Sequence, residues 1–190
     1  TGVTLALGAG NTLTASGLVS GTGTLNASGA VNVNVGGGLT VTNYTAGTGT
    51  LTFTGTGNWT GTGPYGIVDV NGAASTVTLT GSVATSALTI TDGTLSCGAN
   101  TVTAAGVTVG DGAGAAASAV LNAGTGGVTT SAGLSVNATD GDYNPGASGT
   151  LTFSGAGNWA GPAAENYGAV VVTAASVAPQ NAINVSTLTI

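Results

Sequence analysis

The sequence predicts an all-β fold, a parallel β-solenoid, and three observations carry this prediction. Apolar residues alternate with Thr, Ser or Asn at every second position, which is the pattern of short half-buried strands. Clusters of Gly, Asn, Asp and Ser interrupt these strands at a spacing of roughly 8 to 12 residues, as in many-stranded all-β folds. One long phrase occurs twice, which indicates an array of repeated units.

The repeated phrase reads GTLTFTGTGNWTG from Gly49 and GTLTFSGAGNWAG from Gly149. It contains every Phe and Trp of the chain, namely Phe53, Trp59, Phe153 and Trp159. We interpret these four residues as packing anchors in the core rather than as exposed platforms for sugars, because their repetition suits structure better than one binding site. We expect the two copies to occupy the same position in successive units of one continuous coil.

The similarity extends beyond this phrase and divides the chain into unit one, residues 1–90, and unit two, residues 91–190. Ser86–Ile90 matches Ser186–Ile190, and Thr1–Gly8 resembles Thr91–Gly98, which follows Ile90 directly. The residue expected after Ile190 therefore looks like Thr1. This match predicts end-to-end continuation, either through flanking repeats or through stacked protomers.

The alternative architecture is a pair of tandem β-sandwich domains of about 100 residues each. Sandwich domains predict a linker and a charged solvent face, but the strand pattern runs without interruption through residues 88–95. A solenoid predicts uninterrupted coils with small residues at the corners. Coils of about 20 to 30 residues would give roughly 6 to 9 coils, each rising about 4.8 Å, with Leu, Val, Ile and Phe inside and Thr, Ser and Asn outside.

Composition excludes several classes of function. The 190 residues include no Lys, Arg or His, and charged residues make up 3% of the chain against about 25% in an ordinary soluble domain. The hydrophobic fraction of 42% and the mean hydropathy of +0.44 indicate a folded chain rather than a disordered one. Without cations, binding to nucleic acid or docking on anionic membranes is not expected. No apolar run reaches the ~18 residues of a membrane span.

The residues that usually carry enzyme chemistry are scarce, so we predict neither an enzyme nor a cofactor. Cys97 is the single cysteine; it cannot form an internal disulfide, and we expect a small buried core residue. Asp92 and Asp111 adjoin glycine, as turn residues do. Asp69 lies at the end of a strand, and we do not expect a catalytic carboxylate pair.

One stretch resembles the first half of a calcium loop. Asp140, Asp142 and Asn144 place oxygen ligands at every second residue. The bidentate carboxylate expected further along is missing, and Glu165 could supply it only by folding back. Unit one has no carboxylate in the corresponding stretch, so we favour a polar turn, with calcium as the alternative.

Five Asn residues lie in Asn-X-Ser/Thr sequons and are candidate glycosylation sites: Asn26, Asn43, Asn58, Asn137 and Asn184. In a chain this rich in Asn and Thr, chance accounts for most of them. An uncharged exterior would nevertheless benefit from attached sugar.

Phrases such as TLSCGANTVT, residues 94–103, resemble the tandem β-helix repeats of large secreted bacterial surface proteins of the adhesin-like and autotransporter-passenger type. The resemblance implies a right-handed β-solenoid, an extracellular or cell-surface location, and no catalytic residue. We therefore expect a structural or adhesive building block of a filament, stalk or surface layer that self-associates head to tail.

Two further functions remain as alternatives. The first is ice binding by flat arrays of Thr-X-Thr, for which the sequence offers Thr40/Thr42, Thr50/Thr52, Thr78/Thr80 and Thr101/Thr103. The second is a non-catalytic adhesin module that binds surface glycans. A polysaccharide-acting enzyme is disfavoured, because such enzymes need clustered charged residues on one face.

Overall fold

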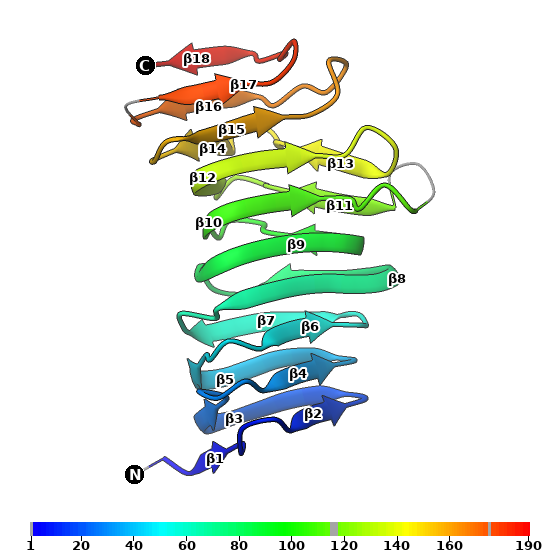
Figure 1. Cartoon of the computed structure of the whole chain (residues 1–190), viewed down its shortest axis with the longest axis vertical. Helices are drawn as coiled ribbons and strands as arrows, with labels where there is room; N and C mark the ends of the chain where they lie inside the picture. The colour runs from blue at the N-terminus through cyan, green and yellow to red at the C-terminus, as the bar shows by residue number, and fades with distance from the viewer. Residues whose placement is uncertain (1, 115–117, 175) are drawn as a thin grey trace.

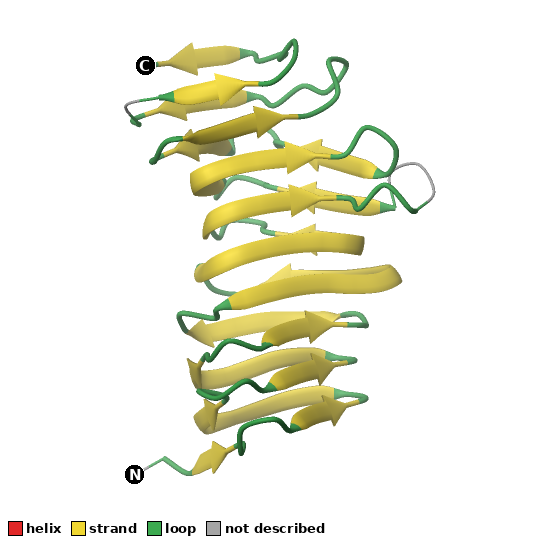
Figure 2. Cartoon of the chain, in the orientation of Figure 1, coloured by secondary structure: helices red, strands yellow, loops and turns green. Residues whose placement is uncertain are grey.

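The computed structural model describes residues 2–114, 118–174 and 176–190. These residues form strands and loops and contain no helix (Figure 2). The chain climbs from one end of the molecule to the other in about nine stacked coils (Figure 1). The predicted β-solenoid is confirmed, and the tandem-sandwich alternative is wrong, because the strands stack as one parallel sheet along a single axis.

Every coil passes through three strand positions, which we name columns I, II and III in chain order. Within a column each strand pairs in parallel with the strand one coil later. Column I contains β2 (Thr12–Ala15), β4 (Asn32–Val35), β6 (Thr50–Phe53), β15 (Gly157–Ala160) and β17 (Val177–Pro179). Column II contains β11 (Ala119–Asn122) and β13 (Gly141–Asn144). Column III contains β1 (Thr4–Ala6), β14 (Thr150–Phe153), β16 (Ala169–Val172) and β18 (Thr187–Thr189).

The longer strands bend from one column into the next. Three run from column II into column III: β3 (Leu18–Asn26), β5 (Gly38–Thr45) and β7 (Gly57–Thr62). β8 (Ile67–Leu79) joins columns I and II, and β9 (Val83–Ser96) passes through all three columns. β10 (Val102–Val109) and β12 (Val128–Val136) each run from column III into column I. In Figure 1 the near strands β10, β12 and β15 point to the right while the chain rises, which is the sense of a right-handed coil.

Coil length varies while the strands stay in register. The coil that begins at Leu51 returns to its starting column at Val68, whereas the longer coil that begins at Val107 returns only at Leu134. The extra residues lie in the corners between columns, where loops tolerate them. The predicted range of six to nine coils includes the number observed.

The core runs along the axis of the coil because inward side chains stack from one coil to the next. In β6, Leu51 and Phe53 are fully buried while Thr50 and Thr52 remain half-exposed. The same alternation appears in β14, where Leu151 and Phe153 are buried. The predicted inward and outward faces of these strands are therefore confirmed.

All eight aromatic side chains of the protein gather in two clusters of four inside the core. One cluster consists of Tyr44, Phe53, Trp59 and Tyr65, and the other of Tyr143, Phe153, Trp159 and Tyr167. The ring centroids of Phe53 and Trp59 are 5.1 Å apart, and those of Phe153 and Trp159 are 4.9 Å apart. Each Trp meets its Tyr edge to face, at 80° and 82°. The repeated phrase therefore builds the same corner twice.

The two corners nevertheless lie in different columns. Column I runs from Leu51 through successive coils to Leu134, which pairs with Trp159. Leu151 is therefore not part of column I. Leu151 instead pairs with Val128 in column III. The two copies thus build equivalent corners of their units but lie in different columns of the coil. One unit fills fourteen strand positions, which is one fewer than five complete coils of three. Each place in the second unit therefore lies one column before the corresponding place in the first.

Candidate functional site at the two ends of the coil

The acidic residues are distributed singly rather than gathered into a catalytic or metal site. Asp69 accepts a hydrogen bond from the Thr91 hydroxyl at 2.9 Å, and Asp92 accepts one from the Gly93 N–H at 2.9 Å. Asp111 accepts the N–H of residue 113 within its own loop. Among the described residues, no three or more His, Cys, Asp or Glu side chains come together in a way that could hold a metal ion.

Asp140 is buried against a loop from the preceding coil. Its carboxylate accepts backbone N–H groups from Asp111 at 3.1 Å, Gly112 at 3.0 Å and Gly114 at 3.3 Å. Burial raises the pKa of this carboxyl, but the hydrogen bonds from Gly112, Gly114 and Asp111 outweigh burial and leave the pKa below its usual value. Because N–H donors surround the carboxylate, this position suits an anion and not a calcium ion.

The other two candidate calcium ligands lie apart from the loop that binds Asp140. Asp142 and Asn144 belong to β13, and the Asn144 side chain donates a hydrogen bond to the Asp142 carboxylate at 2.9 Å. Burial, and to a lesser extent the negative charge of Asp142, raise the pKa of Glu165. Because the Asp140 carboxylate is hydrogen-bonded to the loop of the preceding coil, the structure does not bring the three candidate calcium ligands together.

The remaining core candidates are closed to solvent. Cys97 is fully buried, and burial raises the pKa of its thiol to about 12, so the side chain stays protonated and unreactive near neutral pH. Trp59 and Trp159 are 0% and 4% exposed. Neither tryptophan presents a stacking surface for a sugar.

The sequons lie along the outside of the coil. Asn43, Asn58 and Asn184 are exposed. Asn26 and Asn137 are half-buried, and their side-chain oxygens accept N–H groups two residues later, from Ser28 and Thr139.

The Thr pairs considered for ice binding do not form one array. Thr50/Thr52 lie in β6 of column I. Thr40/Thr42 and Thr78/Thr80 lie in, or just beyond, the column II segments of β5 and β8. Thr101/Thr103 lie at the start of β10 in column III. A ladder that sequence reasoning missed joins Thr103, Thr129 and Thr152 in column III. Its members could not be matched from the sequence, because the lengths of the two coils that separate them differ and are not known in advance.

The first and last coils stand out by their exposed apolar side chains. Five of the six large exposed apolar residues found in the described part of the chain belong to these coils: Val3, Leu5, Leu18, Leu188 and Ile190. Ile67, in the middle of the molecule, is the sixth. The exposed fractions reach 82% at Val3 and 94% at Ile190. The two ends therefore present core residues to solvent.

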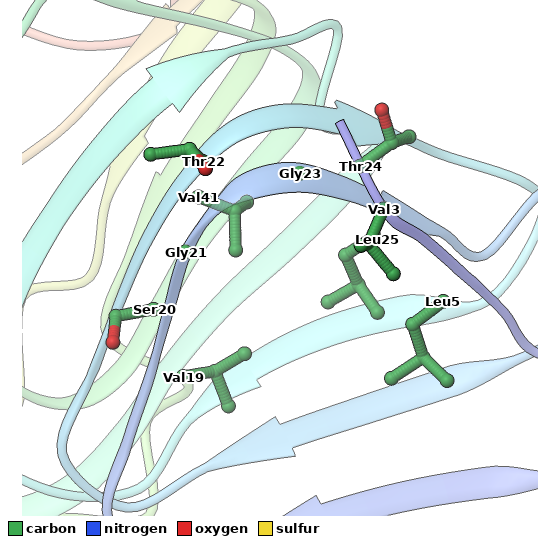
Figure 3. Close-up of a pocket in the computed structure, with 10 residues that line it drawn as sticks. All are labelled: Val3, Leu5, Val19, Ser20, Gly21, Thr22, Gly23, Thr24, Leu25 and Val41. Atoms are coloured by element: carbon green, nitrogen blue, oxygen red, sulfur yellow. The ribbon is translucent and has the colours of Figure 1, made fainter. Parts of the chain in front are cut away.

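Each end also has an apolar hollow and open strand edges. At the N-terminal end, Val3, Leu5, Val19 and Leu25 point into a shared space (Figure 3). At the C-terminal end the hollow is lined by Trp159, Val172, Val177, Pro179 and Leu188, among others. In the described residues β17 pairs with β15 and β18 pairs with β16, so the opposite edges of β17 and β18 carry unpaired backbone groups.

Comparison of this chain with known protein families, curated proteins and solved structures finds no match. No helix of the described residues is long and apolar enough to cross a membrane. Function must consequently be inferred from the geometry of the coil and its ends.

Proposed function

We propose that this protein is a structural or adhesive building block of an extracellular filament, stalk or surface layer, in which β-solenoid units stack end to end. The proposal is supported by one observation: each end of the coil exposes apolar residues whose counterparts are buried where unit one meets unit two inside the molecule. The covering segment is visible at the internal junction between the two units.

The C-terminal end provides the first comparison. Leu88 and Ile90, at the end of unit one, are 1% and 0% exposed because residues 106–109 of β10 pair with this strand. Their counterparts at the end of unit two, Leu188 and Ile190, are 51% and 94% exposed. The same sequence is thus buried at one junction and open at the other.

The N-terminal end gives the complementary comparison. Leu95, in the first strand of unit two, is 0% exposed, whereas the matching Leu5 in β1 is 53% exposed. Burying a Leu or Ile side chain stabilises by roughly 1.5 to 3 kcal/mol. Several such residues at each end, together with a ladder of backbone hydrogen bonds, can offset the entropy lost on association.

The charge distribution also suits stacking. All six acidic residues lie between Asp69 and Glu165, so the outermost coils carry no charged side chain. Two ends can therefore approach without repulsion between like charges. The proposed extracellular location rests on the resemblance to secreted bacterial repeats and on the sequons of the outer surface.

The test is assembly of the purified 190-residue chain, followed by light scattering and electron microscopy as the concentration rises. We expect unbranched filaments of constant width. A variant with Leu188→Asp and Ile190→Asp should remain monomeric, because each aspartate would be buried without a partner. The matched control carries the same charge at two exposed positions in mid-coil, Thr103→Asp and Thr108→Asp, and should still assemble. A wild-type chain that stays monomeric at high concentration contradicts the proposal.

A further inference from the structure

We infer that a second copy of this chain seats on the C-terminal end in one rotational setting only, turned by one column, about one third of a full rotation, relative to the first copy. This inference rests on the proposed function, because it specifies the partner and the geometry of the same end surfaces. It follows from the order in which the chain fills the three columns.

The end of a coil is a step rather than a flat ring. The last coil places β17 in column I, then the segment around Asn184 in column II, and then β18 in column III. Each position lies about one third of the strand spacing further along the axis than the one before it, or roughly 1.6 Å. The lowest open position is therefore above β17 in column I.

The start of the chain has the complementary step. β1 occupies column III, β2 column I and the beginning of β3 column II. A second copy thus offers its lowest strand, β1, from its own column III. The step closes when this strand lies over β17 of the first copy, because β2 and β3 then follow over columns II and III in turn.

The two other settings leave gaps. If β1 lies over β18 with the columns of both copies aligned, one strand position stays empty in column I and another in column II. If β1 lies over the Asn184 segment, one position stays empty in column I. An empty position separates facing strands by about 9.6 Å, twice the hydrogen-bonding distance between strands, and leaves apolar residues uncovered.

The internal junction closes the same kind of step, because unit two begins in column II, the column that follows the end of unit one in column I. Leu95 lies in column II, whereas its counterpart Leu5 lies in column III. One unit therefore displaces the next by one column backwards, and the two units of a whole chain displace a second copy by two columns backwards, which is the same as one column forwards. In the seated pair, Leu5 would lie over Val177, as Leu95 lies over the corresponding Val77, and Val19 would lie over Leu188.

The inference gives the filament a defined symmetry. The described residues fill twenty-eight strand positions, two units of fourteen, which is one position more than nine complete coils. Each copy then adds about 45 Å along the axis and rotates by about one third of a full rotation, before any twist of the coil itself is added. Three copies bring the same face back to the same side.

Cysteine pairs distinguish the three settings. Outward residues that would face each other are Ala6 with Ala178 in the inferred setting, as Ser96 faces Thr78 inside the molecule, Thr4 with Thr187 in the aligned setting, and Thr4 with Asn184 in the third setting. All five positions are exposed, so the substitutions should not disturb the core. Neighbouring strands place Cα atoms about 4.8 Å apart, within the range that a disulfide bridges.

The experiment compares three double variants under mild oxidation: Ala6→Cys with Ala178→Cys, Thr4→Cys with Thr187→Cys, and Thr4→Cys with Asn184→Cys. We expect the first to give a ladder of covalent multimers on a non-reducing gel, at least tenfold more than the other two. The wild-type chain, whose single Cys97 is buried, is the control without a ladder. Cryo-electron microscopy of wild-type filaments should independently give a rise of about 45 Å with about one third of a rotation per copy.

The outcomes separate the two proposals. Filaments that cross-link through Thr187 or Asn184, or that show no rotation per copy, overturn the inferred setting and leave the proposed function standing. A chain that forms no filaments, as judged by light scattering on the unsubstituted protein, overturns both.

Discussion

The side chain of Asp140 shows how this chain uses a charge inside a fold that has almost none. Its carboxylate closes the loop at residues 110–114 by accepting three backbone N–H groups. In the sequence, the even spacing of Asp140, Asp142 and Asn144 favoured a polar turn, with a calcium loop as the alternative. The actual partners lie one coil upstream, and that contact depends on the length of the coil, which residue spacing does not reveal.

The depressed pKa of Asp140 makes stability depend on pH. A carboxyl whose pKa is lower in the folded state stabilises the fold above its unfolded pKa of about 3.9, and this contribution is lost as the pH falls through the folded pKa. We expect Asp140→Asn to lower the Tm by roughly 5 °C at pH 7, because the amide replaces charge-assisted hydrogen bonds. Thermal unfolding followed by circular dichroism from pH 2 to pH 7 measures this effect.

The difference between wild type and Asp140→Asn should disappear at the acid end of that range. Glu165→Gln is the control, since the raised pKa of Glu165 acts in the opposite sense: protonation of Glu165 favours the fold as the pH falls through its folded pKa. A constant difference between wild type and Asp140→Asn at every pH would show that the carboxylate charge is not involved.

The corners between columns limit how closely successive coils can stack. The corner leading into column II is built from Gly17, Gly37 and Gly57 in three successive coils. A Cβ on Gly37 would lie 2.6 Å from the backbone of Gly17, and one on Gly57 would meet the Gly37 carbonyl. The sequence identifies these glycines as corner residues through their place between strands. It does not show which of them touch, because contact depends on the stacking register.

Gly57→Ala should therefore destabilise the protein by about 1 to 3 kcal/mol, since the added methyl group forces two backbones apart. Gly106→Ala is the matched control, because Gly106 also begins a strand segment in mid-coil but has open space where the methyl group would lie. That control should leave stability unchanged or raise it by about 0.5 kcal/mol through the unfolded state. Urea denaturation of both variants gives the comparison, and equal effects would contradict the stacked corner.

For the molecule as a whole, the solenoid was predictable from alternation, turn spacing and the repeated phrase, but the displacement of the units was not. The repeat in the sequence reveals where Phe53 and Phe153 correspond, whereas their columns depend on the number of strand positions between them. Because the coils differ in length, that number cannot be counted from the length of the chain alone. For the same reason the sequence did not indicate that Tyr44 and Tyr143 complete the two aromatic clusters.

A chain in which residues 91–190 are repeated directly after Ile190 tests this geometry without any assembly. The new junction, Ile190 followed by Thr91, copies the native junction between Ile90 and Thr91. Fourteen further strand positions should lengthen the molecule by about 22 Å along one axis and place a third aromatic cluster at the remaining corner. Small-angle X-ray scattering at low protein concentration measures the length, and thermal unfolding should remain a single transition at higher temperature, because each coil is stabilised by its neighbours. Two separately unfolding bodies, or a flexible chain much longer than predicted, would show that the unit does not continue the coil.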